Sequence, residues 1–359
     1  MTRTAYYQLV ALILALLVIT FIIGLAGASP FVVMISMAQG AFGTPGQFAR
    51  VVATMVPLIL CTCGLRFTFT AGLYNLGIEG QITAGAVASM IPIRLFQDNL
   101  PAPLVMLMAL VAGTTGGILW GLLAGWLKVY GRVNEIFAGL GLNFMADGMA
   151  LYLVFGPWKR PGVASMSGTE QINHGLWLPT IGNTEVSPIS LTIALMGLVA
   201  TLIVIRGTQF GLQLRAVGGN LRAAYVLGIP SVHRLLSAFA ICGGFAGMVG
   251  ALQVMALFHR LIPSISSSLG FLALLIAMLV GANTWLILPV TLFFSALNIG
   301  SLQLPLSLDL ESSLAGVIQG MLVLFALLGR GISETVTPAV LKDWLGYFSK
   351  PALTGTDQT

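Results

Sequence analysis

The sequence contains few charged residues, since Asp, Glu, Lys and Arg make up only 8% of its 359 residues. Soluble domains carry about 25% charged residues, so a chain this poor in charge cannot cover a water-exposed surface. The hydrophobic fraction of 57% and the mean hydropathy of +0.97 predict a protein that crosses the lipid bilayer many times. The net charge of +5 comes from basic residues spread between apolar runs, a distribution that does not indicate nucleic-acid binding.

Motifs of several enzyme classes are also missing. None of the four lysines lies in a GxxxxGK[ST] phosphate loop, so we do not expect this chain to hydrolyse ATP by that route. No serine lies in a nucleophile elbow, and no HExxH sequence occurs. The three cysteines and three histidines lack the spacing of metal ligands. We therefore expect no catalytic residue, metal site or cofactor on this chain.

Long apolar runs are abundant, and a membrane-spanning helix needs about 20 mostly apolar residues. About ten runs meet this criterion: 6–28, 49–69, 76–95, 102–127, 135–155, 188–205, 235–258, 269–283, 285–300 and 313–328. The first is longer than the apolar core of a signal peptide, so we expect a retained helix. The predicted fold is an all-α, polytopic membrane protein.

The basic residues predict the orientation of these helices. With the N-terminus placed in the cytoplasm, eleven of the 16 Lys and Arg residues fall on cytoplasmic connections. The positive-inside rule then places both termini in the cytoplasm. We expect one transmembrane domain over 1–330 and a polar cytoplasmic tail over 331–359.

The connection 206–234, RGTQFGLQLRAVGGNLRAAYVLGIPSVHR, combines four arginines with no acid. It also carries apolar residues such as Leu214 and Val226, which a merely solvated loop would not need. Short helices that lie along the membrane and present an apolar face to a cytoplasmic partner would explain both features. The alternative is that the arginines only fix the topology.

Two polar sites fall in apolar surroundings, where charges are expensive and usually functional. Glu79 lies in the glycine-rich segment 72–85, GLYNLGIEGQITAG, together with Asn75 and Gln81. Glycine there allows a broken helix, which membranes tolerate when it lines a cavity or is buried in protein. Such breaks often build the substrate site of a transporter. The alternative is a plain cytoplasmic turn with a solvated Glu79.

The second polar site lies on the run 135–155. Asn143 and Asp147 are four residues apart and share a helix face, with Phe144 beside them. This group could bind a polar ring or a sugar, or it could only hold two helices together by hydrogen bonds. Asn298, in SALNIGS, repeats the Asn-aliphatic-Gly pattern of Asn75, which is a weak indication of an internal repeat.

Four segments resemble one family. NLGIEGQ (75–81) is similar to the Asn-hydrophobic-Gly-x-Glu-Gly-Gln signature of bacterial ABC permeases for nucleosides and simple sugars, in the branched-chain amino acid and ribose permease superfamily. GRVNEIFAGLGLNFMADGMALYLV (131–154) resembles their Val-Asn-Glu loop and following helix, and TQFGLQLRAVGGNLRAAYVLGI (208–229) resembles their cytoplasmic coupling segment. GGFAGMVGALQV (243–254) resembles the next, glycine-rich helix.

The resemblance implies a multi-pass permease of the bacterial inner membrane that imports a small polar solute. It implies two permease chains, identical or sister subunits, two cytoplasmic ATPases that bind ATP and Mg²⁺, and an extracytoplasmic substrate-binding protein. The NLGIEGQ match favours nucleosides, while simple sugars, riboflavin and purine bases stay open. The segment 269–283 departs from many relatives because it keeps Phe271 but lacks polar neighbours.

The candidate residues follow from the polar residues in apolar runs and from the family resemblance. For the substrate pathway we select Asn75, Glu79, Gln81, Asn143, Phe144, Asp147, Phe271 and Asn298. For contact with the ATPase we select Arg215, Asn220, Arg222, Ala223, Ala224 and Gly228, and we expect Gly228 to end a helix. Two other classes compete: an ion-coupled secondary transporter with Glu79 and Asp147 as proton sites, and an intramembrane enzyme.

Overall fold

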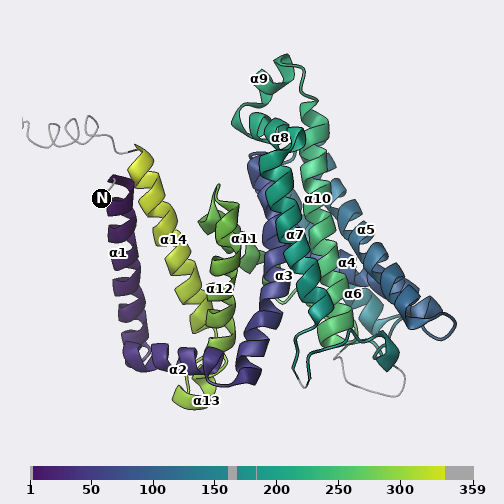
Figure 1. Cartoon of the computed structure of the whole chain (residues 1–359), viewed down its shortest axis with the longest axis horizontal. Coiled ribbons are helices and arrows are strands. Elements are labelled where there is room, and N and C mark those ends of the chain that lie inside the picture. The colour runs from purple at the N-terminus through teal and green to yellow at the C-terminus, as the bar shows by residue number, and fades with distance from the viewer. Residues whose placement is uncertain (1–2, 161–167, 183, 336–359) are drawn as a thin grey trace, which may run out of the picture. The chain divides into compact units, whose positions relative to one another are not determined.

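A computed structural model describes residues 3–160, 168–182 and 184–335, and within these ranges the chain is helical without any strand (Figure 1). The main helices are α1 (Arg3–Leu25), α2 (Pro30–Phe42), α3 (Pro45–Thr70), α4 (Ile78–Phe96), α5 (Ala102–Val129), α6 (Glu135–Phe155), α7 (Pro188–Gly207), α8 (Gln209–Gly219), α9 (Leu221–Val226), α10 (Ser231–Leu252), α11 (Leu269–Val280), α12 (Ile287–Ser301), α13 (Leu304–Leu308) and α14 (Leu314–Thr335). Three short elements complete the list: the 3-10 helices η1 (His174–Leu176) and η3 (Thr284–Leu286), and the π-helix η2 (Gln253–Phe258).

The all-α, multi-span prediction is confirmed, although the number of spans is lower by length and composition. Among the described residues, six helices are long and apolar enough to cross a membrane: Pro45–Thr70, Ala102–Val129, Glu135–Phe155, Pro188–Gly207, Ser231–Phe258 and Thr284–Ser301. A seventh is reached if Val10–Leu25 and Pro30–Phe42, bent by 97°, count as one broken span. Every predicted run contains a helix, but three of these helices are not counted as spans. α4 begins with polar residues, and the apolar helices Leu269–Val280 and Leu314–Gly329 are short.

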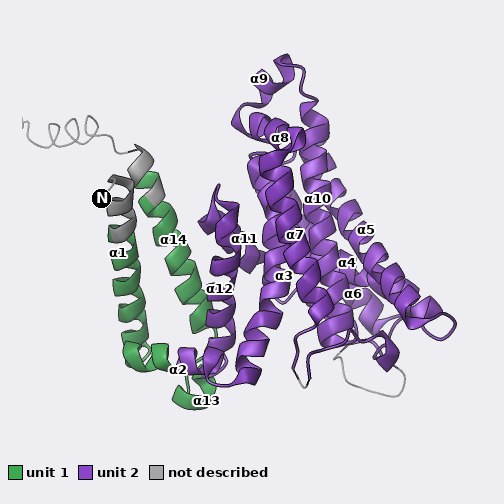
Figure 2. Ribbon diagram, in the orientation of Figure 1, with its two compact units in different colours: residues 1–35, 304–359 green, residues 36–303 purple. Residues whose placement is uncertain are grey.

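The described chain divides into two compact units (Figure 2). Residues 1–35 and 304–359 form the first unit, in which α1 packs against α14. Residues 36–303 form the second unit, which contains most of the helices and all the residues selected for the pathway and for coupling. Of the predicted tail, 331–335 completes α14, and 336–359 lies outside the described residues.

Glycines bring α4, α5 and α10 into backbone contact at the centre of the second unit. A Cβ added at Gly247 of α10 would meet the backbone of Gly113 and Gly117 on α5. A Cβ at Gly85 of α4 would meet the backbone of Gly247, and one at Gly117 would meet the carbonyl of Gly243. Membrane helices associate through van der Waals contact rather than the hydrophobic effect, so small residues at these crossings permit the close approach that stabilises them.

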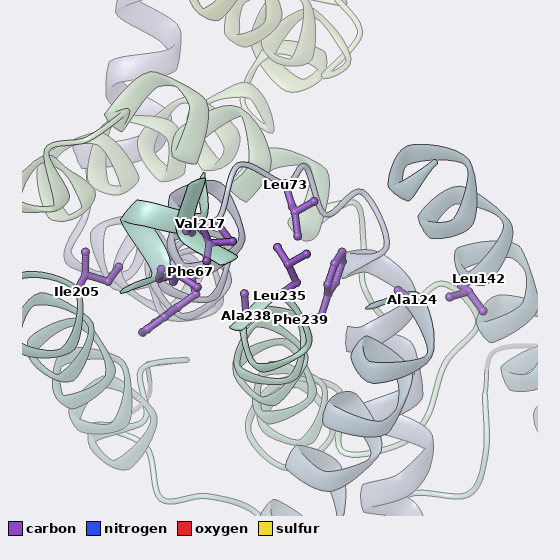
Figure 3. Packing of buried hydrophobic residues seen from close by; sticks show 12 residues of the cluster. Phe67, Leu73, Ala124, Leu142, Ile205, Val217, Leu235, Ala238 and Phe239 are labelled. Carbon is purple, nitrogen blue, oxygen red and sulfur yellow. The ribbon is translucent and has the colours of Figure 1, made fainter. Parts of the chain in front are cut away.

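An apolar cluster closes one end of the second unit (Figure 3). Phe67 from the end of α3 and Phe239 from the start of α10 contribute its two buried aromatic side chains. Leu214 and Val217 of α8, with Ala224 of α9, are buried in the same cluster. The connection between α7 and α10 is therefore folded onto the bundle rather than solvated.

Candidate functional site

The motif NLGIEGQ forms a buried break between two helices. α3 ends at Thr70, and an irregular stretch leads to the start of α4 at Ile78. The amides of Asn75 and Gln81 pair reciprocally, with N···O distances of 3.1 and 3.2 Å. Asn75 also accepts from the Gly77 N–H at 3.2 Å and donates to Cys242 Sγ at 3.1 Å. This network satisfies polar groups that neither lipid nor water reaches, as a broken helix in a membrane requires.

Asn143 joins α6 to the same break. Its Oδ1 accepts from the Gly80 N–H at 2.8 Å, and its Nδ2 donates to the Leu76 carbonyl at 2.9 Å. Asp147, one turn further along, accepts from the Thr83 hydroxyl at 3.1 Å. Both residues thus face α4, as the predicted shared face requires, and both make interhelical hydrogen bonds. Phe144 points elsewhere, because its side chain is 77% exposed.

Glu79 is the most deeply placed acid of this region. It is 4% exposed, so the alternative of a solvated acid in a cytoplasmic turn is wrong. Its Oε1 accepts from the backbone N–H of Phe271, at the start of α11, at 3.0 Å. Its Oε2 is buried without a hydrogen-bond partner among the described residues. The first N–H groups of a helix lack partners within the helix, and Glu79 satisfies one of them at the start of α11.

The side chains of the other two pathway candidates lie apart from this network. Phe271 meets Glu79 through its backbone, while its side chain is 40% exposed. Asn298 is exposed on α12, and no hydrogen bond joins its side chain to the residues around Asn75. The structure therefore brings together Asn75, Glu79, Gln81, Asn143 and Asp147, together with the backbone of Phe271.

The segment 206–234 folds into the two short helices α8 and α9 and then enters α10 (Figure 1). Thr208 caps α8 through the Gly211 N–H, and Asn220 caps α9 through the Ala223 N–H. α9 ends at Val226, and Gly228, directly after the C-cap Leu227, has a φ of +79°, the left-handed conformation that glycine adopts most readily. The Gly228 N–H donates to Tyr225 and the Ile229 N–H donates to Ala224, a Schellman arrangement that confirms the predicted helix end.

The six coupling candidates divide by exposure. Ala224 is buried in the apolar cluster, whereas Arg222, Ala223 and Gly228 are exposed. The sequence indicated an apolar face on this segment, Val226 included, but the residues of the tip were not selected for coupling. In the structure, Tyr225, Val226 and Leu227 are 74%, 83% and 77% exposed. Together with Leu221, which is 47% exposed, these three form the α9 tip, an apolar surface on an arginine-rich segment.

A second connection, between α6 and α7, is anchored to the segment that follows α10. The N–H groups of Thr169, Ile172 and Leu178 donate to the carbonyls of Leu261, His259 and Met255. The Trp177 ring contacts two histidine rings, with centroid distances of 4.0 Å to His174 and 3.8 Å to His259. Burial lowers the pKa of His259, and the nearby His174 lowers it further.

No group of three or more His, Cys, Asp or Glu residues that could hold a metal ion occurs in the described part of the chain. Except for Glu79 Oε2, the polar groups around Asn75 form hydrogen bonds with one another, with the backbone or with Cys242. As a whole, this arrangement can hold a broken helix and a second helix end together inside a membrane. We find no arrangement of a nucleophile with a base among its contacts.

The sequence was compared with known proteins. The profile of the family described as branched-chain amino acid transport system / permease component matches residues 47–327. The guanosine ABC transporter permease protein NupP of Bacillus subtilis is 25% identical over 88% of this chain and 91% of its own length. The nucleoside ABC transporter permease protein NupB of Lactococcus lactis is 25% identical over 84% of each chain. The glucose ABC transporter permease protein TsgB13 of Haloferax volcanii is 28% identical over 77% of this chain and 74% of its own.

Proposed function

The chain belongs to the family of branched-chain amino acid transport system permease components, and from that premise we propose that it is the membrane-spanning subunit of an ATP-driven importer for nucleosides. The family is one of transport permeases rather than enzymes, and its members are multi-pass proteins of the inner membrane. The relatives named for guanosine and nucleosides cover most of this chain, which supports a nucleoside as the solute. One relative is named for glucose, so a simple sugar is the second candidate.

The observation that carries the proposal is the α9 tip. An exposed apolar tip flanked by Arg215 and Arg222, with a buried anchor at Ala224, fits a groove on a cytoplasmic protein that also offers acidic side chains. An ATPase subunit that binds ATP and Mg²⁺ is the proposed occupant. We propose the orientation that the positive-inside rule predicts, with both termini in the cytoplasm. The loop 168–178 would then lie outside, where a substrate-binding protein would deliver the solute.

The proposed pathway runs beside the break at Asn75, Glu79 and Gln81. A second permease chain, identical or a sister, would complete it, with up to ten helices crossing the membrane in each chain. Phe271 carries an exposed ring that could contact a nucleobase there, whereas the exposed ring of Phe144 points away from the break and would contact the solute only outside it. Asp147 and Asn298 would supply polar contacts, and none of these contacts needs to be tight, since tight binding would slow release.

Uptake by the assembled transporter tests the function. The chain and its partners are co-reconstituted in proteoliposomes, and entry of radiolabelled guanosine, ribose, riboflavin and adenine is measured with and without ATP. ATP-dependent entry of guanosine is expected. Entry that ignores ATP and disappears with an uncoupler would instead identify an ion-coupled secondary transporter, and ATP-dependent entry of ribose alone would identify a sugar importer.

Substitution of the α9 tip tests the docking surface. The double change Tyr225→Ala and Val226→Ser removes apolar contact area from exposed side chains, so the fold should be retained to within about 0.5 kcal/mol. ATPase affinity should fall about tenfold or more, as expected when side chains central to an interface are removed. A change at Gly228 would be less informative, because its left-handed conformation strains any other residue. Unchanged ATPase binding by the double variant contradicts the docking assignment.

A further inference from the structure

The N-terminus of α11 is capped by a residue from another helix. Ser268, the residue that precedes α11, makes no side-chain capping bond and adopts a left-handed conformation. Glu79 of α4 takes that role by accepting from the Phe271 N–H. A Cβ at Gly270 would lie 2.8 Å from Ile78 Cγ2 and 3.2 Å from the Glu79 carboxyl carbon, so the helix end sits directly against α4. The start of α11 is therefore held by one buried carboxylate.

The other end of α11 is held by arginines. The carbonyl of Ala282, just after the helix, accepts from Arg66 of α3 at 3.5 Å. The side chain of Asn283 accepts from Arg206 of α7 at 3.2 Å. Cations are favourable at a helix C-terminus for the same reason that an anion is favourable at the N-terminus. α11 is thus held at both ends by charges from other helices.

Arg206 links this short helix to the segment that carries the α9 tip. It lies in the last turn of α7, and Thr208, two residues later, caps α8. A hydrogen bond therefore joins Asn283 to Arg206, and only Thr208 separates the helix that carries Arg206 from α8. A movement of α8 and α9 would reach the end of α11 through a single side-chain contact.

The backbone on both sides of α11 has the geometry of a hinge. Ser264, Ser267 and Ser268 have φ angles of 56°, 48° and 60° before the helix, and Gly281 has a φ of 56° after it. Left-handed conformations are costly for residues other than glycine and persist only where the surroundings hold them. A hinge consists of a few residues at the ends of an element that absorb large changes in φ and ψ, and these four residues lie at the two ends of α11. α11 also buries Leu272, Ala273, Ile276, Ala277 and Val280, so a movement would carry the helix with its packed face as a unit.

We propose that α11 carries the movement of the ATPase-docking segment to the break at Asn75, and that Arg206, Asn283, Arg66 and Glu79 are the positioning residues that hold it. This inference rests on the proposed function and adds the moving element to it. Docking of the ATPase displaces α8, Arg206 draws on Asn283, and α11 shifts against Glu79 beside the pathway.

The ratio of solute uptake to ATP hydrolysis tests the link. In proteoliposomes that contain the complete transporter, Asn283→Leu and Arg206→Gln should each lower guanosine uptake per ATP hydrolysed by at least about fivefold, the lower end of typical coupling between sites. Hydrolysis itself should continue. The melting temperature should not change, because the Arg206–Asn283 contact is exposed.

Matched variants separate coupling from folding. Asn283→Asp keeps an acceptor for Arg206 and should retain the wild-type ratio. Gly270→Ala pushes the N-terminus of α11 away from Glu79 and should lower the ratio as Asn283→Leu does. Arg50→Gln removes an exposed arginine that pairs with Glu185 and has no contact with α11, so it should change nothing. Uptake and hydrolysis that fall together with the melting temperature would overturn the proposal in favour of a structural role.

A second measurement needs no solute. All three native cysteines are buried, so a Phe271→Cys variant offers one accessible thiol beside Glu79. Its labelling by a maleimide should change when the bound ATPase is trapped with vanadate, and Arg206→Gln should abolish that change. If the extent of labelling is the same with and without the vanadate-trapped ATPase, this inference alone is overturned. An ATPase that does not co-purify with the chain overturns the proposed function and the inference with it.

Discussion

Two regions of the second unit are held together in opposite ways. α4, α5 and α10 meet through glycines whose backbones touch, so their positions are fixed by contact along their whole crossing. α11 is a helix of 12 residues, bounded by left-handed residues and held at its ends by Glu79, Arg66 and Arg206. Close-packed contact gives a rigid scaffold, whereas three contacts to charged residues at the helix ends and left-handed connections give an element that can change position.

The break at Asn75 lies where these two regions meet. Asn75, Gln81 and Asn143 bind the break to α6 and to Cys242 of α10, and therefore to the scaffold. Glu79, in the same motif, binds instead to α11. One short sequence motif thus contributes both to the fixed part and to the part that we propose to move.

The largest expected effect comes from breaking the scaffold. Gly247→Ala places a Cβ against the backbone of Gly113 and Gly117, which cannot rotate away, so the variant should lose about 3 kcal/mol or more of stability. The unfolding temperature can be followed with a thiol-reactive dye, because all three cysteines are buried and free. Gly148→Ala is the matched control, since nothing lies near that position and alanine favours the helix. Equal stability of the two variants would show that the glycine contacts are not what fixes the scaffold.

A smaller effect is expected from the hydrogen bonds of the break. Asn143→Leu leaves the buried Gly80 N–H and the Leu76 carbonyl without partners, which should cost about 1–3 kcal/mol. Asn298→Leu, at an exposed position on α12, should change stability by about 0.5 kcal/mol or less. The same dye assay compares them. A loss of transport in Asn143→Leu with full stability would point to solute contact rather than to a structural bond.

The sequence predicted the helices better than it predicted their contacts. Each of the ten apolar runs contains a helix, because the need for about 20 apolar residues is a local property of the chain. The second helix, Pro30–Phe42, was missed because it follows the first apolar run after a bend at Gly27, whose φ is +80°. The break near Asn283 was predicted after residue 283, but α11 already ends at Val280, where Gly281 adopts a left-handed φ of 56°.

The candidate site could be predicted only where its geometry is local. Helical spacing placed Asn143 and Asp147 on one face, and that is what the structure has. Spacing does not tell which helix that face meets, and the partner of Glu79 lies 192 residues away in sequence. Phe144 was grouped with its neighbours by sequence, although a residue next to Asn143 projects about 100° around the helix and here is exposed. The role of Arg66 and Arg206 at the end of α11 had no sequence signal, because each lies on a different helix.

The smallest expected effect concerns the strained segment that leads into α11. Burial and His174 lower the pKa of His259 below its ordinary value of 6.5, so the unfolded chain binds a proton at a higher pH than the folded chain does. The contribution of His259 to stability is therefore complete above pH 6.5 and is lost as the pH falls below that value. Between about pH 8 and about pH 5, the melting temperature of the wild type should fall more than that of His259→Asn, a change that suits the left-handed φ of 52°. His233→Asn, on the exposed start of α10, should follow the wild type. If the melting temperature of His259→Asn falls with pH as much as that of the wild type, protonation of His259 does not destabilise the segment that leads into α11.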